Sequence, residues 1–269
     1  MSAPSASKRA RAAALDAAVT TLAVPGLGWP KGMFVLAGGT RLVSSSEKTI
    51  LHLPPSGRLS TLAGYPHNEA KRKDGEGVKA RFKQPIGLTV DRAGNVVVAD
   101  FLSHAICKVT TAGAVVSTLA GNGEEGFADG QGADARFNKP HSVVVAANGD
   151  LIVSDRGNHC LRVVTPEGAV RTLVGNGQPG FADGEGADAR FKRPGSLAMD
   201  PEGNVLVSDS GNHSVRLVTM AATVCQGLPT GRARLRGSIF PAASSSTWKV
   251  PSWSQTCRTT GCARSWAGR

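Results

Sequence analysis

The sequence has few aromatic residues, few cysteines and no long apolar run. Aromatic residues make up 5% of the 269 residues, and no stretch has the roughly 20 consecutive apolar residues that a membrane-spanning helix needs. The five cysteines are odd in number and none falls at a repeated position, which favours a reducing intracellular setting over a disulfide framework. The chain also lacks a Gly-x-Ser-x-Gly nucleophile elbow and the Lys-Ser/Thr of a P-loop.

The basic charge lies at the two ends of the chain. Lys and Arg number 31 against 20 Asp and Glu, which gives a formal net charge of +11. Residues 34–220 carry 20 basic and 19 acidic residues, whereas residues 221–269 carry seven basic residues and no acid. The body is therefore nearly neutral, and the high pI does not by itself indicate a nucleic-acid-binding domain.

The two ends differ from the body in composition. Residues 1–29 begin with an Ala/Ser-rich stretch that predicts a disordered leader, with an organellar transit peptide as the alternative; a cytoplasmic location is expected. Within it, Thr21-Leu22-Ala23 repeats the Thr-Leu-Ala of residues 61–63, and one hypothesis is that it forms a stray outer strand of a neighbouring sheet. Residues 221–269 hold three of the four Trp and predict a basic, disordered tail without repeats. One hypothesis is that a changed reading frame or splice site ends the array near Thr219.

A short pattern recurs along the body with a period of 55 and then 54 residues. Each unit has an Arg-Phe pair, a proline three residues after the Phe, and later an Asp with a His four residues on. The pairs are Arg81 and Phe82, Arg136 and Phe137, and Arg190 and Phe191. The later signature comprises Asp100 and His104; Asp155, Asn158 and His159; and Asp209, Asn212 and His213. A fixed period of this length indicates an array of equivalent structural units.

Each unit contains four short β-rich segments separated by turn residues. In the third unit they are residues 141–146, 151–154, 160–164 and 170–174, with the hairpin signal Asn148-Gly149 between the first two. The second segment is apolar at successive positions, which is typical of a strand covered on both faces. We therefore predict an all-β fold, a β-propeller of four-stranded antiparallel blades over residues 30–220. About four blades are present, and in the first one Ser45 stands where the others have Asp.

The stretches Asp155-Arg-Gly-Asn-His-Cys-Leu-Arg and Asp209-Ser-Gly-Asn-His-Ser-Val-Arg resemble the NHL repeat. The unit that begins at Asp100 departs from this pattern because it lacks the Gly-Asn pair. The resemblance implies an array that is most often six-bladed and that binds proteins, RNA or small ligands. Four blades would then form an incomplete array, an open arc with exposed sheet edges. Relatives in the wider six-bladed group include lactonases and the amidating lyase.

The repeated Asp and His residues have two interpretations. They suit zinc or calcium chemistry, but each pair recurs at the same turn of a different blade, which would spread the pairs around a ring. We therefore expect the signature to be structural, with Asp accepting backbone N–H bonds in the turn and His bonding between blades. Cys160 adjoins His159, but neighbours on a strand face opposite ways, so a Cys–His catalytic pair is not expected.

These observations predict a non-enzymatic scaffold for protein partners, with no catalytic residue, metal or cofactor assigned. The alternative is a metal-dependent propeller hydrolase or lyase, which would need unlike ligands converging on the axis. An RNA-binding propeller is the third hypothesis, because Lys71-Arg72-Lys73 is a basic cluster within the neutral body. No membrane association is expected, and the binding residues, the partner and the oligomeric state stay open.

Overall fold

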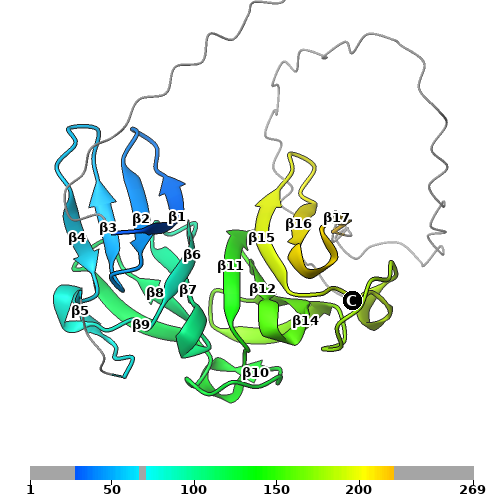
Figure 1. Ribbon diagram of the computed structural model, residues 1–269. Helices are drawn as coiled ribbons and strands as arrows, with labels where there is room; N and C mark the ends of the chain where they lie inside the picture. Colours follow the sequence, from blue (N-terminus) through cyan, green and yellow to red (C-terminus); the bar gives the residue numbers. More distant parts are fainter. Residues whose placement is uncertain (1–27, 67–70, 221–269) are drawn as a thin grey trace, which may run out of the picture. The chain divides into compact units, whose positions relative to one another are not determined.

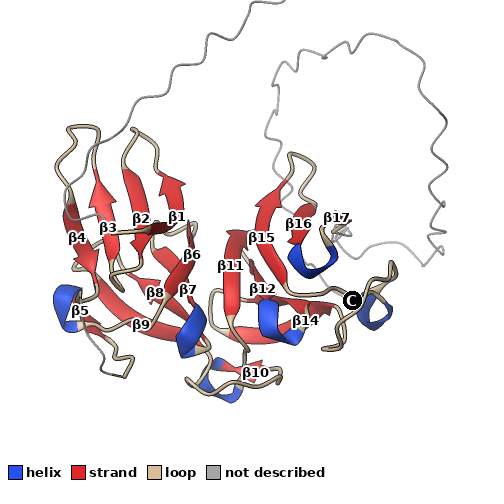
Figure 2. Cartoon of the chain, in the orientation of Figure 1, coloured by secondary structure: helices blue, strands red, loops and turns tan. Residues whose placement is uncertain are grey.

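A computed structural model describes residues 28–66 and 71–220, which form four antiparallel sheets (Figures 1 and 2). The first sheet contains β1 (Pro30–Val35), β2 (Arg41–Ser45), β3 (Ile50–Leu53) and β4 (Ser60–Ala63). The second contains β6 (Pro85–Val90), β7 (Val96–Asp100), β8 (Ala105–Val109) and β9 (Val115–Ala120). The third contains β11 (Pro140–Val145), β12 (Leu151–Asp155), β13 (Cys160–Val164) and β14 (Ala169–Val174). The fourth contains β15 (Pro194–Met199), β16 (Val205–Asp209) and β17 (Ser214–Val218). We call these sheets blades 1 to 4, and the all-β propeller prediction is confirmed.

The repeated prolines and aspartates set the strand register. In blades 2, 3 and 4 the first residue of the first strand pairs with the last residue of the second: Pro85 with Asp100, Pro140 with Asp155, and Pro194 with Asp209. In blade 1 the corresponding pair is Pro30 with Ser45. Proline at the start of a strand is tolerated because its missing N–H is not needed there. Each first strand then carries a register shift directly after its proline.

The connectors between blades contribute short outer strands that the sequence did not predict. β5 (Gly75–Glu76) pairs with β9, and β10 (Gly130–Gln131) pairs with β14. A single turn of 3-10 helix follows each of them, η1 (Gly77–Lys79) and η3 (Gly132–Asp134); η5 (Gly186–Asp188) is the counterpart before blade 4. In blades 2 and 3 the connector therefore adds a fifth strand to the outer edge of the blade that it leads into.

The hydrophobic cores lie between adjacent blades. Three clusters join blade 1 to 2, blade 2 to 3, and blade 3 to 4, and each contains the Phe of one Arg-Phe pair: Phe82, Phe137 and Phe191. Burying a Phe side chain contributes about 1.5–3 kcal/mol. The Phe of each Arg-Phe pair is thus the residue that packs in the hydrophobic core between two adjacent blades.

The second strand of a blade serves two cores at once. In β7, Val96 and Val98 belong to the cluster shared with blade 1, whereas Val97 and Ala99 belong to the cluster shared with blade 3. All five residues of β7 are buried, as are those of β12. This explains why the strand is apolar at successive positions, since side chains alternate between two covered faces.

The boundaries of the end segments stay predictions. The expected leader (1–29) lies almost entirely, and the expected tail (221–269) wholly, outside the described residues, as does the proposed stray strand at Thr21–Ala23. Among the described residues, no core cluster joins blade 4 to blade 1. No helix in this part of the chain is long and apolar enough to cross a membrane.

Candidate functional site

Each repeated aspartate lies at the end of the second strand of its blade and is fully buried. The Asp155 carboxylate accepts the N–H of Asn138 at 2.8 Å and the side-chain amide of Asn158 at 2.8 Å. Asp209 has the equivalent partners, the N–H of Lys192 at 2.8 Å and Asn212 at 2.7 Å. The carboxylate therefore ties the turn of its blade to the connector that enters the same blade.

The source of these N–H bonds differs from the expectation. The aspartates make no side-chain cap bond to the 3-10 turns that follow them, η2 (Phe101–Ser103), η4 (Arg156–Asn158) and η6 (Ser210–Asn212). The donors instead come from the connector, because the Pro–Asp register brings the residues before each proline against the carboxylate. Sequence spacing alone cannot distinguish a local turn bond from this longer-range one.

An arginine seven residues after the aspartate completes the junction in blades 3 and 4. The Arg162 guanidinium is fully buried and donates to Asp155 at 2.9 Å and to Asp129 at 2.7 Å. It lies 5.1 Å from the ring centre of Phe127 and 5.2 Å from that of Phe137. Burial raises the pKa of Asp155 to about 6, and the Arg162 charge opposes that rise.

In blade 2 the guanidinium of the junction comes from the connector instead of the third strand. Cys107 stands where blades 3 and 4 have Arg162 and Arg216, and Arg72 stands where the connectors have Phe127 and Phe181. The Arg72 guanidinium donates to Cys107 Sγ at 3.4 Å and also pairs with Asp74. The connector thus supplies the cation that the strand lacks, so Arg72 of the predicted basic cluster is held within the fold.

The buried cysteines are not suited to nucleophilic chemistry. Burial raises the pKa of the Cys107 thiol to about 12, and burial raises the pKa of Cys160 well above its usual value. A thiol attacks as its thiolate, so both groups are unreactive near neutral pH.

The arginines of the Arg-Phe pairs contact the fold through both main-chain and side-chain atoms. The Arg136 carbonyl accepts the Arg162 guanidinium at 3.1 Å, and the Arg190 carbonyl accepts Arg216 at 3.2 Å. The Arg136 side chain itself pairs with Glu124 at 3.4 Å. In blade 2, the Arg81 guanidinium lies 4.6 Å from the ring centre of Tyr65.

The repeated histidines connect one blade to the next. His104 and His159 adopt left-handed backbone angles, with φ of 50° and 56°. Nδ1 of His104 accepts the N–H of Lys139 at 3.2 Å, and Nδ1 of His159 accepts that of Arg193 at 3.0 Å. An amide can only donate, so each imidazole is neutral with its proton on Nε2. Burial lowers the pKa of both histidines, which agrees with this state. For His213, no following blade lies within the described residues.

The signature residues do not converge on one centre. Within residues 28–66 and 71–220, no group of three or more His, Cys, Asp or Glu side chains is arranged to hold a metal ion. Each Asp–His pair serves its own blade, so the geometry offers no candidate metal centre in this part of the chain.

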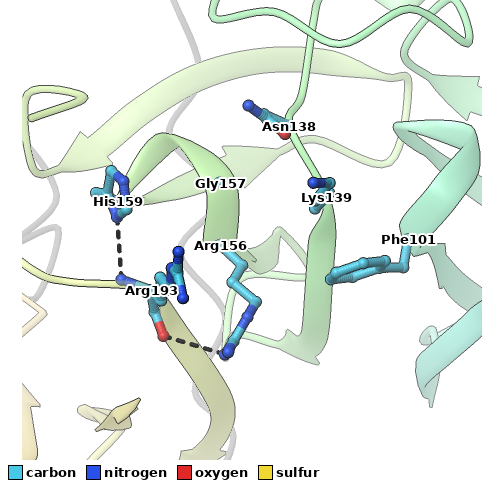
Figure 3. Close-up of a pocket in the computed structure, with 7 residues that line it drawn as sticks. All are labelled: Phe101, Asn138, Lys139, Arg156, Gly157, His159 and Arg193. Atoms are coloured by element: carbon cyan, nitrogen blue, oxygen red, sulfur yellow. Dashed lines mark hydrogen bonds between the residues drawn. The ribbon is translucent and has the colours of Figure 1, made fainter. Parts of the chain in front are cut away.

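The candidate site is a cavity of about 410 Å³ between blades 2 and 3 and the connector that leads into blade 4 (Figure 3). Its lining includes Phe101 from blade 2, Lys139 from the connector, Arg156 and His159 from η4 and its end, and Arg193 from the next connector. Figure 3 shows Arg156 directed toward Arg193, whose carbonyl accepts its guanidinium at 3.2 Å. Residues from two blades and two connectors thus line one cavity.

The cavity is cationic. Lys139, Arg156 and Arg193 carry positive charge, no carboxylate lines it, and none of the three forms a salt bridge with a described residue. The nearby Asp155 and Asp209 are buried in the junctions. His141 lies close by, where burial and the Arg156 charge lower its pKa. A cavity of this kind attracts anions.

The cavity lies where the repeat breaks, and the sequence interpretation did not identify it. Arg156 follows its aspartate where the other units have Phe101 and Ser210. Lys139 and Arg193 share the position before the proline, where blade 2 has Gln84. These differences were visible in the aligned units. The proximity of Lys139, Arg156 and Arg193 cannot be read from the aligned units, because it depends on how neighbouring blades pack.

The family model for the NHL repeat matches residues 137–164 and 191–216, which cover the first three strands of blade 3 and most of blade 4, with their signature residues. These blades are NHL repeats. The prediction of an NHL-repeat β-propeller is confirmed, and blade 2 keeps the same architecture although its signature lacks Gly-Asn.

Relatives of this NHL-repeat chain include proteins of two kinds. It is 29% identical over 180 residues to NHL repeat-containing protein 2 of Bos taurus, covering 62% of this chain and 25% of that protein. It is 30% identical over 165 residues to a protein of Caenorhabditis elegans named as a probable peptidyl-alpha-hydroxyglycine alpha-amidating lyase, covering 59% of this chain and 45% of that protein. The chain thus spans less than half the length of either relative.

A similar solved structure supports the fold. The auxiliary nutrient binding protein of Bacteroides ovatus superposes with a TM-score of 0.57 at 24% identity, covering 71% of this chain and 48% of that one. At this identity the likeness concerns the fold of the NHL propeller alone.

Proposed function

We propose that this chain is a non-enzymatic NHL-repeat scaffold that binds a protein partner through the face that holds the cationic cavity. One observation carries the proposal. The repeated aspartates are bound within the blade junctions, whereas the three cations of the cavity have no acidic partner among the described residues. Loops that several blades present together are suited to recognition by many contacts.

The signature residues belong to the architecture in this proposal. The bonds of Asp155 and His159 to the connectors support a structural role for them, and the same applies to Asp100, His104 and Asp209. A cytoplasmic location also belongs to the proposal, and the buried free thiols of Cys107 and Cys160 are compatible with a reducing compartment.

The test is affinity capture with the full chain, its pocket variant Lys139→Asn/Arg156→Ser, and the control variant Arg171→Gln. Arg171 is exposed on β14 and does not line the cavity. We expect a defined set of proteins that the wild type and the control capture and the pocket variant loses. Capture of identical sets by all three would refute the role of this face, and capture abolished by ribonuclease would favour RNA instead.

The similarity to the C. elegans protein favours one second candidate, a metal-dependent hydrolase or lyase. That function needs a metal held by several protein ligands. Elemental analysis of the purified full chain separates the candidates: stoichiometric zinc or calcium would support the enzyme, and metal well below one equivalent would support the scaffold.

A further inference from the structure

We infer that the cationic cavity binds the carboxylate side chains of an acidic peptide segment. The inference rests on the proposed function and names the chemistry that the partner presents. Lys139, Arg156 and Arg193 line one cavity of about 410 Å³ and have no carboxylate among the lining residues. Like charges brought together repel, and a bound anion removes that repulsion.

The donors of the cavity suit a carboxylate. Arg156 is oriented by one bond from Nη1 to the Arg193 carbonyl, at 3.2 Å, and no second acceptor for it lies within the described residues. A guanidinium with free N–H groups binds carboxylates with defined geometry. His159 also lines the cavity, and because its Nδ1 accepts a backbone N–H, its Nε2 is a further donor.

A second break in the repeat makes room for Arg156. Gly195 stands where the other units have Ile86 and His141. A Cβ added to Gly195 would lie 3.6 Å from Arg156 Nη1 and only 2.8 Å from Ser210 Oγ. A longer side chain at position 195 would therefore crowd the guanidinium. Arg156 and Gly195 come from adjacent blades, and together they place the positive charge in the cavity.

The observations favour a peptide over a nucleic acid. The body is nearly neutral, with 20 basic and 19 acidic residues over 34–220, so no long basic track follows a phosphate backbone. The other basic cluster is partly occupied, because Arg72 is bound to Asp74 and Cys107. A single cavity with three cations can bind a few carboxylates that lie close together, as in a short acidic segment of a peptide.

The experiment measures fluorescence anisotropy of a short labelled peptide with adjacent glutamates, titrated with the full chain. The variants are Lys139→Asn, Arg156→Ser and the control Arg171→Gln. Asn is chosen because Lys139 has a φ of 56°, which Asn tolerates. We expect each pocket substitution to weaken binding about tenfold and the control to leave it unchanged. Added salt should weaken wild-type binding more steeply than binding by the variants.

Three outcomes would overturn the inference. The first is equal affinity of all variants for the peptide. The second is equal binding of a version of the peptide in which glutamine replaces glutamate. The third is displacement of the labelled peptide by inorganic phosphate or an oligoribonucleotide at a lower concentration than unlabelled peptide requires. Unfolding curves confirm that each variant is folded, and Lys139→Arg should retain binding. If the peptide fails to bind while affinity capture still depends on Lys139 and Arg156, the scaffold proposal stands and only the ligand chemistry is wrong.

Discussion

At the residue scale, the polar signature of the repeat is a set of charges and hydrogen bonds buried at each blade junction. Arg162 and Asp155 are both fully buried and lie 2.9 Å apart. Such a pair adds little to stability compared with apolar residues, but removing one partner leaves a buried charge without compensation. A substitution that removes only one residue of the pair should therefore lower the free energy of unfolding.

Replacing Arg162 with Met should destabilise the chain strongly. The Asp155 carboxylate would lose its counter-charge, and the carbonyls of Ala128 and Arg136 would lose a donor. We expect the free energy of unfolding to fall by about 3–5 kcal/mol in urea titrations. The exposed substitution Arg171→Met should change it by no more than about 0.5 kcal/mol. Equal effects of the two substitutions would contradict the assigned geometry.

The histidine bonds should make stability depend on pH. The pKa of His104 and His159 is lowered in the folded chain, so their contribution is present above the unfolded value of about 6.5 and is lost as the pH falls through the folded value. Asn tolerates the left-handed backbone and keeps an acceptor that does not titrate. The His104→Asn/His159→Asn variant should therefore lose less stability than the wild type on acidification.

The comparison with the wild type isolates these two groups. Asp155 titrates with the opposite sign, because a raised folded pKa gives stability that is lost as the pH rises. Asp155 and His141 are present in both proteins, so their contributions cancel in the difference. Parallel curves of unfolding free energy against pH would show that the histidines do not carry the effect.

At the element scale, the blade is a unit whose parts come from different stretches of the chain. The connector supplies the outer strands β5 and β10 and, in blade 3, both aromatic rings beside Arg162, those of Phe127 and Phe137. In blade 2 it supplies the guanidinium as well, because Arg72 acts where the strand has Cys107. The residues at positions 72 and 107, far apart in sequence, thus depend on each other: one of the two supplies the guanidinium of the junction.

This exchange predicts a reciprocal rescue. Cys107→Arg alone would place two guanidiniums in one junction, and Arg72→Phe alone would remove the cation there. The double variant Arg72→Phe/Cys107→Arg recreates the pair found in blades 3 and 4. We expect both single variants to be destabilised and the double variant to recover, with a coupling of about 0.5–3 kcal/mol in a double-mutant cycle. Additive losses would show that the two positions are independent.

At the scale of the whole molecule, each blade covers its neighbour, and blade 4 has no described neighbour on one side. Val215 and Leu217 are 75% and 55% exposed there, whereas the equivalent Leu161 and Val163 of blade 3 are buried. The same apolar positions are therefore core in one blade and surface in another. Exposed apolar patches of this kind favour association.

We expect the purified chain to associate as its concentration rises. Leu217→Lys copies Lys108, which occupies the same position in blade 2, and should lower the association without disturbing the sheet. Sedimentation velocity over a concentration series measures the effect, with Arg171→Gln as a charge control. Identical sedimentation of the wild type and Leu217→Lys would argue against this face as the contact.

Much of this architecture could be predicted from residues 81–218. The successive apolar residues of β7 and β12 indicated strands covered on both faces, and the structure confirms it. The short strand β5 was missed because Gly75 and Glu76 have low β-propensity and pair only through the neighbouring β9. The cationic cavity was missed because its side chains come from two blades and two connectors that are far apart in sequence.

The sequence by itself determined the repeat, its strands and the residues that seal the junctions, because side-chain period and turn chemistry are local properties. Only the tertiary structure decided that Arg72 replaces an arginine of the strand, and that Lys139, Arg156 and Arg193 share a cavity. Those arrangements depend on the packing of one blade against the next, which brings together residues that no local pattern relates.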